Sequence, residues 1–200
     1  MRAMSSVDFP PQHGNEFLAG HLLVAMPGIG DPRFQSAVIL VCLHTPQHAM
    51  GIRLNAAYEG MTLAAILARL GVEGAPRHPD QLVLAGGPVE RERGYVLHSD
   101  DFEIAGSTMP IVEGLSLTAT QEVLKAMTDQ TPGPARSSLA LGYAGWGPGQ
   151  LESELRENVW LACPPDPDLV FDEDLDSKWR KALGKMGVSA AALSPHAGRA

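Results

Sequence analysis

Cysteine, positive charge and long apolar runs are all scarce in this sequence of 200 residues. With only two cysteines, Cys42 and Cys163, the chain cannot build a disulfide scaffold. The longest apolar run, residues 37–43, has strand length and falls far short of the roughly 18 residues that a membrane-spanning helix needs. Lys and Arg number 15 against 23 Asp and Glu, so the net charge is −8 and generic binding to nucleic-acid phosphates is not expected.

The composition that remains is that of a globular protein rich in turns. Hydrophobic residues make up 44% of the chain, and it holds 21 Gly and 16 Pro. We expect one domain over residues 16–195, preceded by a flexible leader over 1–15 and followed by a frayed tail over 196–200. Met1–Asn15 has no apolar segment typical of a signal peptide, which favours a soluble cytoplasmic protein.

Hydrophobic patterning predicts strands and helices that do not alternate strictly. Apolar and β-branched runs predict strands over 21–27, 36–44, 49–55, 81–85, 94–98, 138–143 and 159–163. Helical periodicity predicts helices over 61–70, 118–127, 150–157 and 177–186. Because regular β-α-β-α order is absent, we expect an α+β fold with a mixed, largely antiparallel sheet and about four packed helices.

Local signals support some of these boundaries. Gly71 stands where a glycine commonly ends a helix. Thr118 and Gln121 have the spacing of a capping box, which predicts that the second helix begins at Thr118. The charged segment Glu90–Arg93 reads as a turn between two strands.

Two glycine-rich segments are candidates for phosphate-binding loops. Gly28-Ile29-Gly30 fails the dinucleotide pattern, because Arg33 stands where its third glycine belongs. Gly142–Gln150 precedes a helix but has no Lys-Ser/Thr pair, so a tight turn with a packed Trp146 is the favoured interpretation.

No metal or cofactor site is predicted. Cys42, His44 and His48 could converge at a hairpin end, but a buried cysteine with two hairpin-end histidines is the favoured alternative. The acidic stretch 166–176 does not fit a calcium-binding loop. It is interpreted as a solvated loop or as a patch that meets a basic partner.

The last predicted helix carries a small basic face. Its residues are Lys178, Arg180, Lys181 and Lys185. We expect these groups to pair locally with the acidic stretch rather than to bind DNA, and whether they pair within one chain or between two is left open.

Several separate motifs in order resemble the AlgH/YqgE-like family of bacterial proteins. They are Ala25-Met26-Pro27, Asp31-Pro32-Arg33-Phe34 with Ser36, Gly51, Asn55, Gly86-Gly87-Pro88-Val89, Gly94–His98, Gly142–Glu152, Glu154-Leu155, Asn158 and Trp160-Leu161. The resemblance covers roughly residues 17–187. It implies a compact single domain of sheet plus helices in the bacterial cytoplasm, with members labelled as transcriptional regulators and with no catalytic residue to transfer.

The chain departs from the family pattern at one point. An Arg-Pro pair usually follows the asparagine that matches Asn55, and here Ala56-Ala57 follows it. If that arginine serves a ligand, this chain has lost it or uses Arg53 instead.

Two functions remain open. No G-x-S-x-G or H-E-x-x-H motif is present, which favours a non-enzymatic regulatory or interaction module that contacts DNA, if at all, through a protein partner. The alternative is a small-molecule binder or an unrecognised enzyme whose pocket is formed by loops at strand ends. The residues predicted for that pocket are Asp31, Arg33, Asn55, Gly86, Gly87, His98, Trp146 and Gln150.

Overall fold

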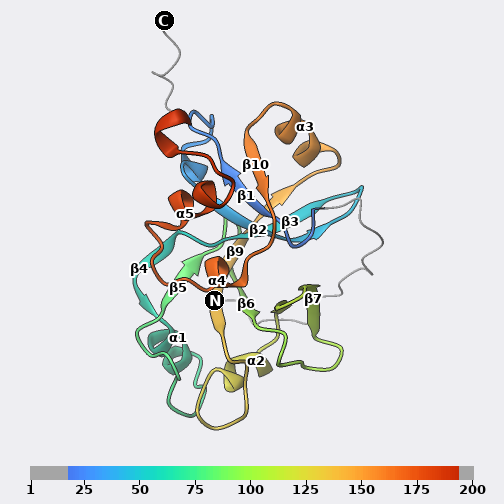
Figure 1. Ribbon diagram of the computed structural model, residues 1–200. Coiled ribbons are helices and arrows are strands. Elements are labelled where there is room, and N and C mark those ends of the chain that lie inside the picture. The colour runs from blue at the N-terminus through green and yellow to red at the C-terminus, as the bar shows by residue number, and fades with distance from the viewer. Residues whose placement is uncertain (1–17, 194–200) are drawn as a thin grey trace, which may run out of the picture.

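The computed structural model describes residues 18–193, and the expected leader and the tail at 196–200 lie outside them. A single curled sheet dominates the molecule (Figure 1). Its strands are β1 Leu22–Ala25, β2 Val38–His44, β3 Ala49–Arg53, β4 Ala57–Thr62, β5 Leu82–Ala85, β6 Val89–His98, β7 Thr108–Val112, β8 Leu115–Thr118, β9 Ser137–Trp146 and β10 Trp160–Cys163. The α-helices are α1 Leu63–Arg69, α2 Glu122–Ala126, α3 Gln150–Arg156, α4 Pro167–Val170 and α5 Lys178–Lys185, and short 3₁₀ turns span Pro32–Phe34 and Ala190–Leu193.

The sheet runs in the order β10-β1-β2-β3-β9-β6-β8-β7, with neighbours antiparallel. Strand β5 adds to β9 in parallel, and β4 adds to β5. The fold is therefore α+β with a mixed, largely antiparallel sheet, as the sequence predicts. Figure 1 shows α3 beside β10 and α5 beside β1, whereas α1 lies beside β4 and β5 and α2 lies at the same end of the molecule as α1.

Strand β2 is buried on both faces, which explains its continuous apolar sequence. Alternate side chains point to opposite faces of a strand. Val38, Leu40 and Cys42 belong to the cluster on one face, and Ile39 and Val41 belong to the cluster on the other. Two packed faces require two covering layers, which α3 and α5 help to supply.

Helix α5 lies over the first of these clusters. Ala182 and Leu183 are fully buried within it, and the indole of Trp179 donates a hydrogen bond of 2.8 Å to the carbonyl of Ala25 in β1. Gly187, with φ +69°, follows the helix in the left-handed conformation that glycine adopts readily. This docking carries Lys178, the first residue of α5, into the protein.

Two sequence predictions of local structure are wrong, and a third, the tight turn with a packed Trp146, is right only in part. Glu90–Arg93 belongs to β6, and the turn between β5 and β6 is residues 86–88. The pairing shifts from Val89 opposite Tyr143 to Gly94 opposite Leu141, so the charged residues form an irregular stretch within the strand. A charged surface bulge and a charged turn have the same composition, and only the long-range pairing distinguishes them.

The second helix begins at Glu122, four residues later than predicted. Thr118 instead ends β8, and its hydroxyl bonds to His98 Nε2 at 2.9 Å. Strands β7 and β8 form a tight hairpin closed by Glu113 and Gly114. The prediction also missed β4, β7 and β8; β4, for example, has the sequence AYEGMT and no fully buried residue, so it lacks the apolar run that marks the other strands.

The glycine-rich segment is a strand over most of its length. Residues 142–146 extend β9, where they pair with β3 and pack against β6, and the turn is confined to Gly147–Gly149. Gly142 has φ +73°, and a Cβ atom there would lie 2.6 Å from the carbonyl oxygen of Gly87. Glycine is therefore required at this position by strand packing.

Candidate functional site

Five of the predicted pocket residues lie beside one another and are linked by backbone and side-chain contacts: Asp31, Arg33, Asn55, Gly86 and Gly87. Asp31 and Arg33 form an exposed ion pair with Oδ2 and Nη2 2.6 Å apart, and the hydrogen bond from Arg33 lowers the pKa of Asp31. Arg53 Nη1 donates to the carbonyl of Arg33 at 2.6 Å, and the backbone N–H of Arg53 donates to Gly86 O at 2.8 Å. The arrangement places Arg53 next to the loop from which the family's usual arginine is missing.

Asn55 joins the same group. Its Oδ1 accepts from the backbone N–H of Val38 at 2.9 Å and from Arg53 Nε at 3.3 Å, and its Nδ2 donates to Ser36 O at 2.7 Å. Both ends of the amide are occupied by intramolecular bonds. Asn55 therefore fixes the chain segment that enters β2.

Gly86 and Gly87 allow a close backbone approach. A Cβ atom on Gly86 would lie 2.3 Å from Gly142 O, and one on Gly87 would lie 2.0 Å from the carbonyl carbon of Tyr143. Real Cβ atoms do not come this near to backbone atoms, so side chains are excluded sterically at both positions. The sequence predicts that these glycines let a ligand come close to the backbone, but in the structure it is the backbone of β9 that comes close to them.

Trp146 and Gln150 bind a carboxylate that the sequence analysis did not select. Glu154 Oε2 accepts from the indole N–H groups of Trp146 at 2.8 Å and Trp160 at 2.7 Å, and Oε1 accepts from Gln150 Nε2 at 2.8 Å. Both indoles are nearly buried. Trp160 also makes an edge contact with Phe34, with ring centroids 5.8 Å apart, which connects this cluster to the Asp31–Arg33 loop.

His98 lies apart from the other seven residues. It pairs with Ser137 at the start of β9, whereas Trp146 ends β9 nine residues later, a separation of about 30 Å along a strand. His98 is fully buried, its Nδ1 bonds to Ser99 O and its Nε2 to Thr118 Oγ1, both at 2.9 Å, and burial lowers its pKa. Whether any of the eight residues contacts a ligand stays a prediction.

A cavity of about 370 Å³ lies elsewhere, between the segment leading into β5, the start of β9 and the α4–α5 region. We call it the Lys178 cavity. The residues that the argument uses are Asp80, Gln81, Leu84, Phe171, Glu173 and Lys178. Its volume lies within the usual range for small-molecule sites.

Lys178 is the most unusual group in this cavity, because only 1% of the residue is exposed. Its ammonium donates a hydrogen bond of 2.7 Å to the carbonyl of Val170. Burial lowers its pKa to about 8, while the negative charge of Asp172 opposes the shift and the positive charges of Lys181 and Arg136 add to it. A buried cation is costly unless an anion or several hydrogen bonds compensate it.

Gln81 presents the second unusual group. Its Nε2 donates to Ser137 O at 2.9 Å, and its Oε1 is buried without a hydrogen-bond partner in the described part of the chain. Because the carbonyl oxygen of Ser137 can only accept, it must face the N–H₂ end of the Gln81 amide, and this bond fixes the orientation of the Gln81 side chain. The oxygen is therefore the end of the side chain that is left without a partner among the described residues.

The acidic stretch and the basic helix pair within one chain. Lys181 Nζ lies 2.5 Å from Asp172 Oδ2 and 3.4 Å from Asp174 Oδ2, and Lys185 contacts Asp166. These contacts confirm the local pairing for Lys181 and Lys185 and place it within one chain, whereas Lys178 donates to the carbonyl of Val170. They also leave Asp172 engaged by Lys181 rather than by Lys178.

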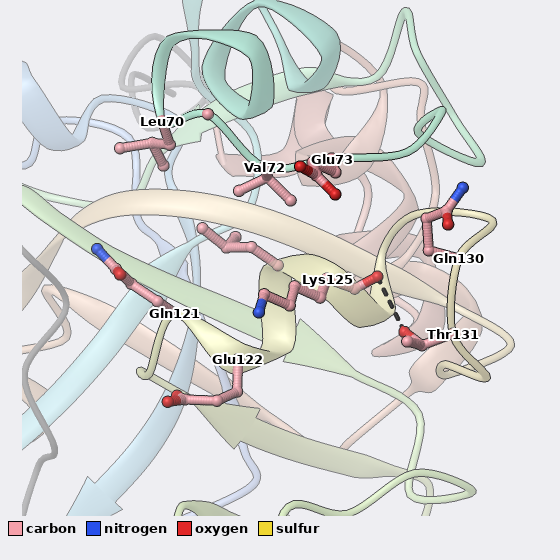
Figure 2. Close-up of a pocket in the computed structure, with 10 residues that line it drawn as sticks. Leu70, Val72, Glu73, Gln121, Glu122, Lys125, Gln130 and Thr131 are labelled. Carbon is pink, nitrogen blue, oxygen red and sulfur yellow. Dashed lines mark hydrogen bonds between the residues drawn. The ribbon is translucent and has the colours of Figure 1, made fainter.

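A second hollow, the α1–α2 cleft, has a volume of about 550 Å³ (Figure 2). Figure 2 shows Leu70 and Val72 on one side and Gln121, Glu122 and Lys125 on the other. Lys125 contributes its backbone carbonyl to a 3.1 Å bond from the Thr131 hydroxyl. Although this cleft is larger, its charged side chains are all exposed, so it lacks the desolvated polar groups that distinguish the Lys178 cavity.

Two findings limit the chemistry of the described residues. No group of three or more His, Cys, Asp or Glu side chains within residues 18–193 is arranged to hold a metal ion. None of the helices described there is long and apolar enough to cross a membrane. The thiol of Cys42 is fully buried, and burial raises its pKa to about 12, as expected for a cysteine that packs as a small apolar residue.

The fold and these motifs define an α+β protein of the AlgH-like class. The model of the AlgH-like family matches residues 22–191, and the chain belongs to this family. Among its relatives is a UPF0301 protein of Caulobacter vibrioides, 56% identical over 185 residues that cover 92% of this chain and 95% of the relative. A second relative, a UPF0301 protein of Afipia carboxidovorans, is 48% identical, and the match covers 94% of this chain and 92% of the relative.

Two solved structures share the fold. The solution structure of AlgH from Pseudomonas aeruginosa has a TM-score of 0.73 and 37% identity, and the match covers 96% of this chain and all of that one. A crystal structure of a Corynebacterium diphtheriae protein has a TM-score of 0.67 over 86% of this chain and 88% of its own, at 19% identity, and supports the fold alone.

Sequence reasoning missed both groups that distinguish the Lys178 cavity. The sequence places Lys178 on the small basic face of the last helix, and Gln81 is only the first residue of a predicted strand. A signal for Lys178 was present: it precedes Ala182 by four residues and so shares the buried face of α5. No comparable signal marks Gln81, whose orientation depends on Ser137, 56 residues away.

Proposed function

We propose that this protein is a non-enzymatic regulatory module that binds a small polar molecule in the Lys178 cavity. One observation carries the proposal: a single cavity is lined by Lys178, whose ammonium is buried, and by Gln81, whose buried amide oxygen has no hydrogen-bond partner among residues 18–193. Both groups lose hydration on folding and regain a polar partner if a ligand enters. The absence of nucleophile motifs from the sequence supports binding rather than catalysis.

The regulatory part of the proposal concerns a partner protein. With a net charge of −8, the chain has no overall attraction for DNA, so any effect on transcription is proposed to pass through a protein partner in the cytoplasm. A gel shift with duplex DNA at low salt is expected to show no complex with the protein alone. A complex whose affinity falls steeply with salt would contradict this part of the proposal.

A thermal-shift screen of the full chain against polar metabolites tests the binding. A ligand at 100 times its Kd adds about 2.7 kcal/mol to the unfolding free energy, which is a shift of roughly 5–10 °C for a chain of this length. The variant Gln81→Leu is expected to lose most of the shift, because it removes the oxygen that lacks a partner.

The control is Gln121→Leu, which changes a glutamine of the α1–α2 cleft in the same way. This variant is expected to keep the shift. A screen without any stabilising compound, or equal losses in the two variants, would contradict the proposal that the ligand binds in the Lys178 cavity.

A further inference from the structure

We propose that His98 makes the β7–β8 hairpin sensitive to acid, so that protonation of its ring favours an open form in which the hairpin has separated from β6. In the closed form the neutral ring ends a chain of hydrogen bonds that connects β7, β8 and β6. The inference goes beyond the proposed function and does not depend on the Lys178 cavity.

The β7–β8 hairpin forms one edge of the sheet. Within the described residues β7 is the last strand in the sheet order and pairs with β8 alone. Strand β8 in turn pairs with β6 over three residue pairs, from Val96 opposite Thr118 to His98 opposite Ser116. A short ladder at the edge of a sheet opens locally at a lower free energy than a central one. The hairpin is therefore a segment that can open without unfolding of the whole protein.

The hydrogen bonds around His98 fix the position of each proton in the chain. The carbonyl oxygen of Ser99 can only accept, so Nδ1 of His98, 2.9 Å away, carries a proton. In the neutral ring Nε2 is then an acceptor, and the Thr118 hydroxyl donates to it at 2.9 Å. The Thr118 oxygen accepts from the Thr108 hydroxyl at 2.8 Å, and the Thr108 oxygen accepts from the backbone N–H of Ile104 at 2.9 Å. All the donors of this chain point from β7 towards His98.

Protonation of Nε2 reverses the chain. The added N–H points at the Thr118 oxygen, so the Thr118 hydroxyl has to donate to Thr108 instead. The Thr108 oxygen then receives two hydrogen bonds, from Thr118 and Ile104, and its own proton has no acceptor among residues 18–193. At the same time the fully buried ring of His98 acquires a positive charge. Both effects disfavour the closed form relative to an open form in which water reaches the ring.

The charges around His98 do not compensate the protonated ring. Asp101 is the carboxylate that acts on it, but Asp101 is exposed and already accepts from the Ser99 hydroxyl at 2.6 Å and from the backbone N–H of Ala135 at 3.1 Å. Strands β7 and β8 carry no titratable side chain. The β6–β7 loop, α2 and the residue before β9 supply the remaining charged groups, which are Asp100, Glu103, Glu122, Lys125 and Arg136.

These remaining charges act weakly on His98. The first four belong to exposed residues, where water screens them, and the guanidinium of Arg136 is paired with Asp168 at 2.7 Å. Burial therefore outweighs the attraction of Asp101 and holds the pKa of His98 below its ordinary value.

The sign of the pH dependence follows from this pKa. In the open form water surrounds the ring and its pKa is close to the ordinary value of about 6.5, whereas the closed form takes up the proton only at a lower pH. Below pH 6.5 the open form binds more protons, so its population rises by up to about tenfold for each pH unit until the closed form is protonated as well. Between pH 7.5 and pH 5.0 the rise is at most roughly thirtyfold.

The open form remains a minority because opening exposes apolar surface. The apolar residues of the hairpin, which are Met109, Ile111, Leu115 and Leu117, are at most 9% exposed in the closed form. Their burial opposes opening at every pH at which the protein is folded. The test must therefore detect a rare opening, which hydrogen exchange of backbone amides does.

The first test compares two edges of the sheet in the wild-type chain. Protection factors, which are corrected for the intrinsic effect of pH on exchange, are measured by NMR at pH 7.5 and pH 5.0. The amides of Ile104 and of β8 are expected to lose protection by about ten- to thirtyfold on acidification. Amides of β10, the strand at the opposite end of the sheet order, are expected to change much less, because opening of β10 does not expose His98. Unchanged protection of β8, or equal losses in β8 and β10, would overturn the inference.

The second test assigns the effect to His98. His98→Gln removes the titrating ring, and its β8 amides are expected to keep the same protection at both pH values. The control is His48→Gln, which replaces an exposed histidine of the β2–β3 turn and is expected to behave as the wild type. A loss of protection on acidification that persists in His98→Gln, or that disappears in His48→Gln, would overturn the inference.

A measurement on the wild type decides the question if His98→Gln does not fold. The nitrogen chemical shifts of the His98 ring are expected to show the proton on Nδ1 at pH 7.5 and a titration midpoint below pH 6.5. A ring that carries its proton on Nε2, or that titrates above pH 6.5, would contradict the hydrogen-bond chain on which the inference rests.

Discussion

Replacing Glu154 by alanine is expected to destabilise the protein strongly. The carboxylate accepts three hydrogen bonds, from Trp146 and Trp160 on one oxygen and from Gln150 on the other. The two tryptophan residues are 5% and 3% exposed, so their indole N–H groups cannot turn to water once the carboxylate is removed. Each buried donor left without a partner costs about 1–3 kcal/mol, which gives about 2–6 kcal/mol for the pair.

The measurement is guanidinium-induced unfolding followed by tryptophan fluorescence. Glu154→Gln keeps a carbonyl oxygen for the two indoles and loses the bond from Gln150, so its expected cost is smaller, about 1–2 kcal/mol. The control is Glu157→Ala in the same turn of the chain. Glu157 is exposed and accepts a bond from the Ser153 hydroxyl, so its removal is expected to change stability by less than about 0.5 kcal/mol. A loss below 1 kcal/mol for Glu154→Ala, or equal losses for the alanine and glutamine variants, would refute the reasoning.

Two further predictions concern stability. Gly87→Ala places a Cβ atom 2.0 Å from a backbone carbon of Tyr143 and is expected to destabilise the protein by more than about 2 kcal/mol. Gly184→Ala, in open space on α5, is expected to stabilise it by about 0.5–1 kcal/mol. Thermal unfolding of the two variants checks this pair of predictions, and equal effects would contradict the steric argument. Because the pKa of Lys178 is about 8 in the folded chain and about 10.4 in the unfolded one, the unfolded state binds more protons between these values, and stability is expected to rise with pH through that window. The rise, on the order of 3 kcal/mol, is expected to be absent from Lys178→Met, and a difference between the two proteins that does not depend on pH would contradict the assignment.

In the Asp31–Arg33 loop, sequence motifs predicted which residues lie close together but not whether they bind a ligand. The sequence singled out Asp31, Arg33, Asn55 and Gly86, and the structure does bring them together through Arg53. Their polar groups, however, bond to one another and to the backbone. Turn-forming residues and ligand-binding residues belong to the same chemical types, so composition alone does not distinguish the two roles.

The sequence by itself determined the elements whose cause is local. The continuous apolar, β-branched run of residues 38–44, helical spacing in 63–69 and 178–185, and Gly71 and Gly187 with φ of +66° and +69° all follow from interactions within a few residues.

Only the tertiary structure decided the elements and groups that depend on distant partners. The charged half of β6 becomes a strand because β9 pairs with it, and Thr118 ends a strand because His98 lies beside it. Lys178 is buried because α5 docks on β1, and Gln81 presents its oxygen because Ser137 takes its nitrogen. Burial and hydrogen-bond orientation depend on contacts between residues far apart in the chain, so a local pattern such as the spacing of Lys178 and Ala182 indicates a shared face without fixing what covers it.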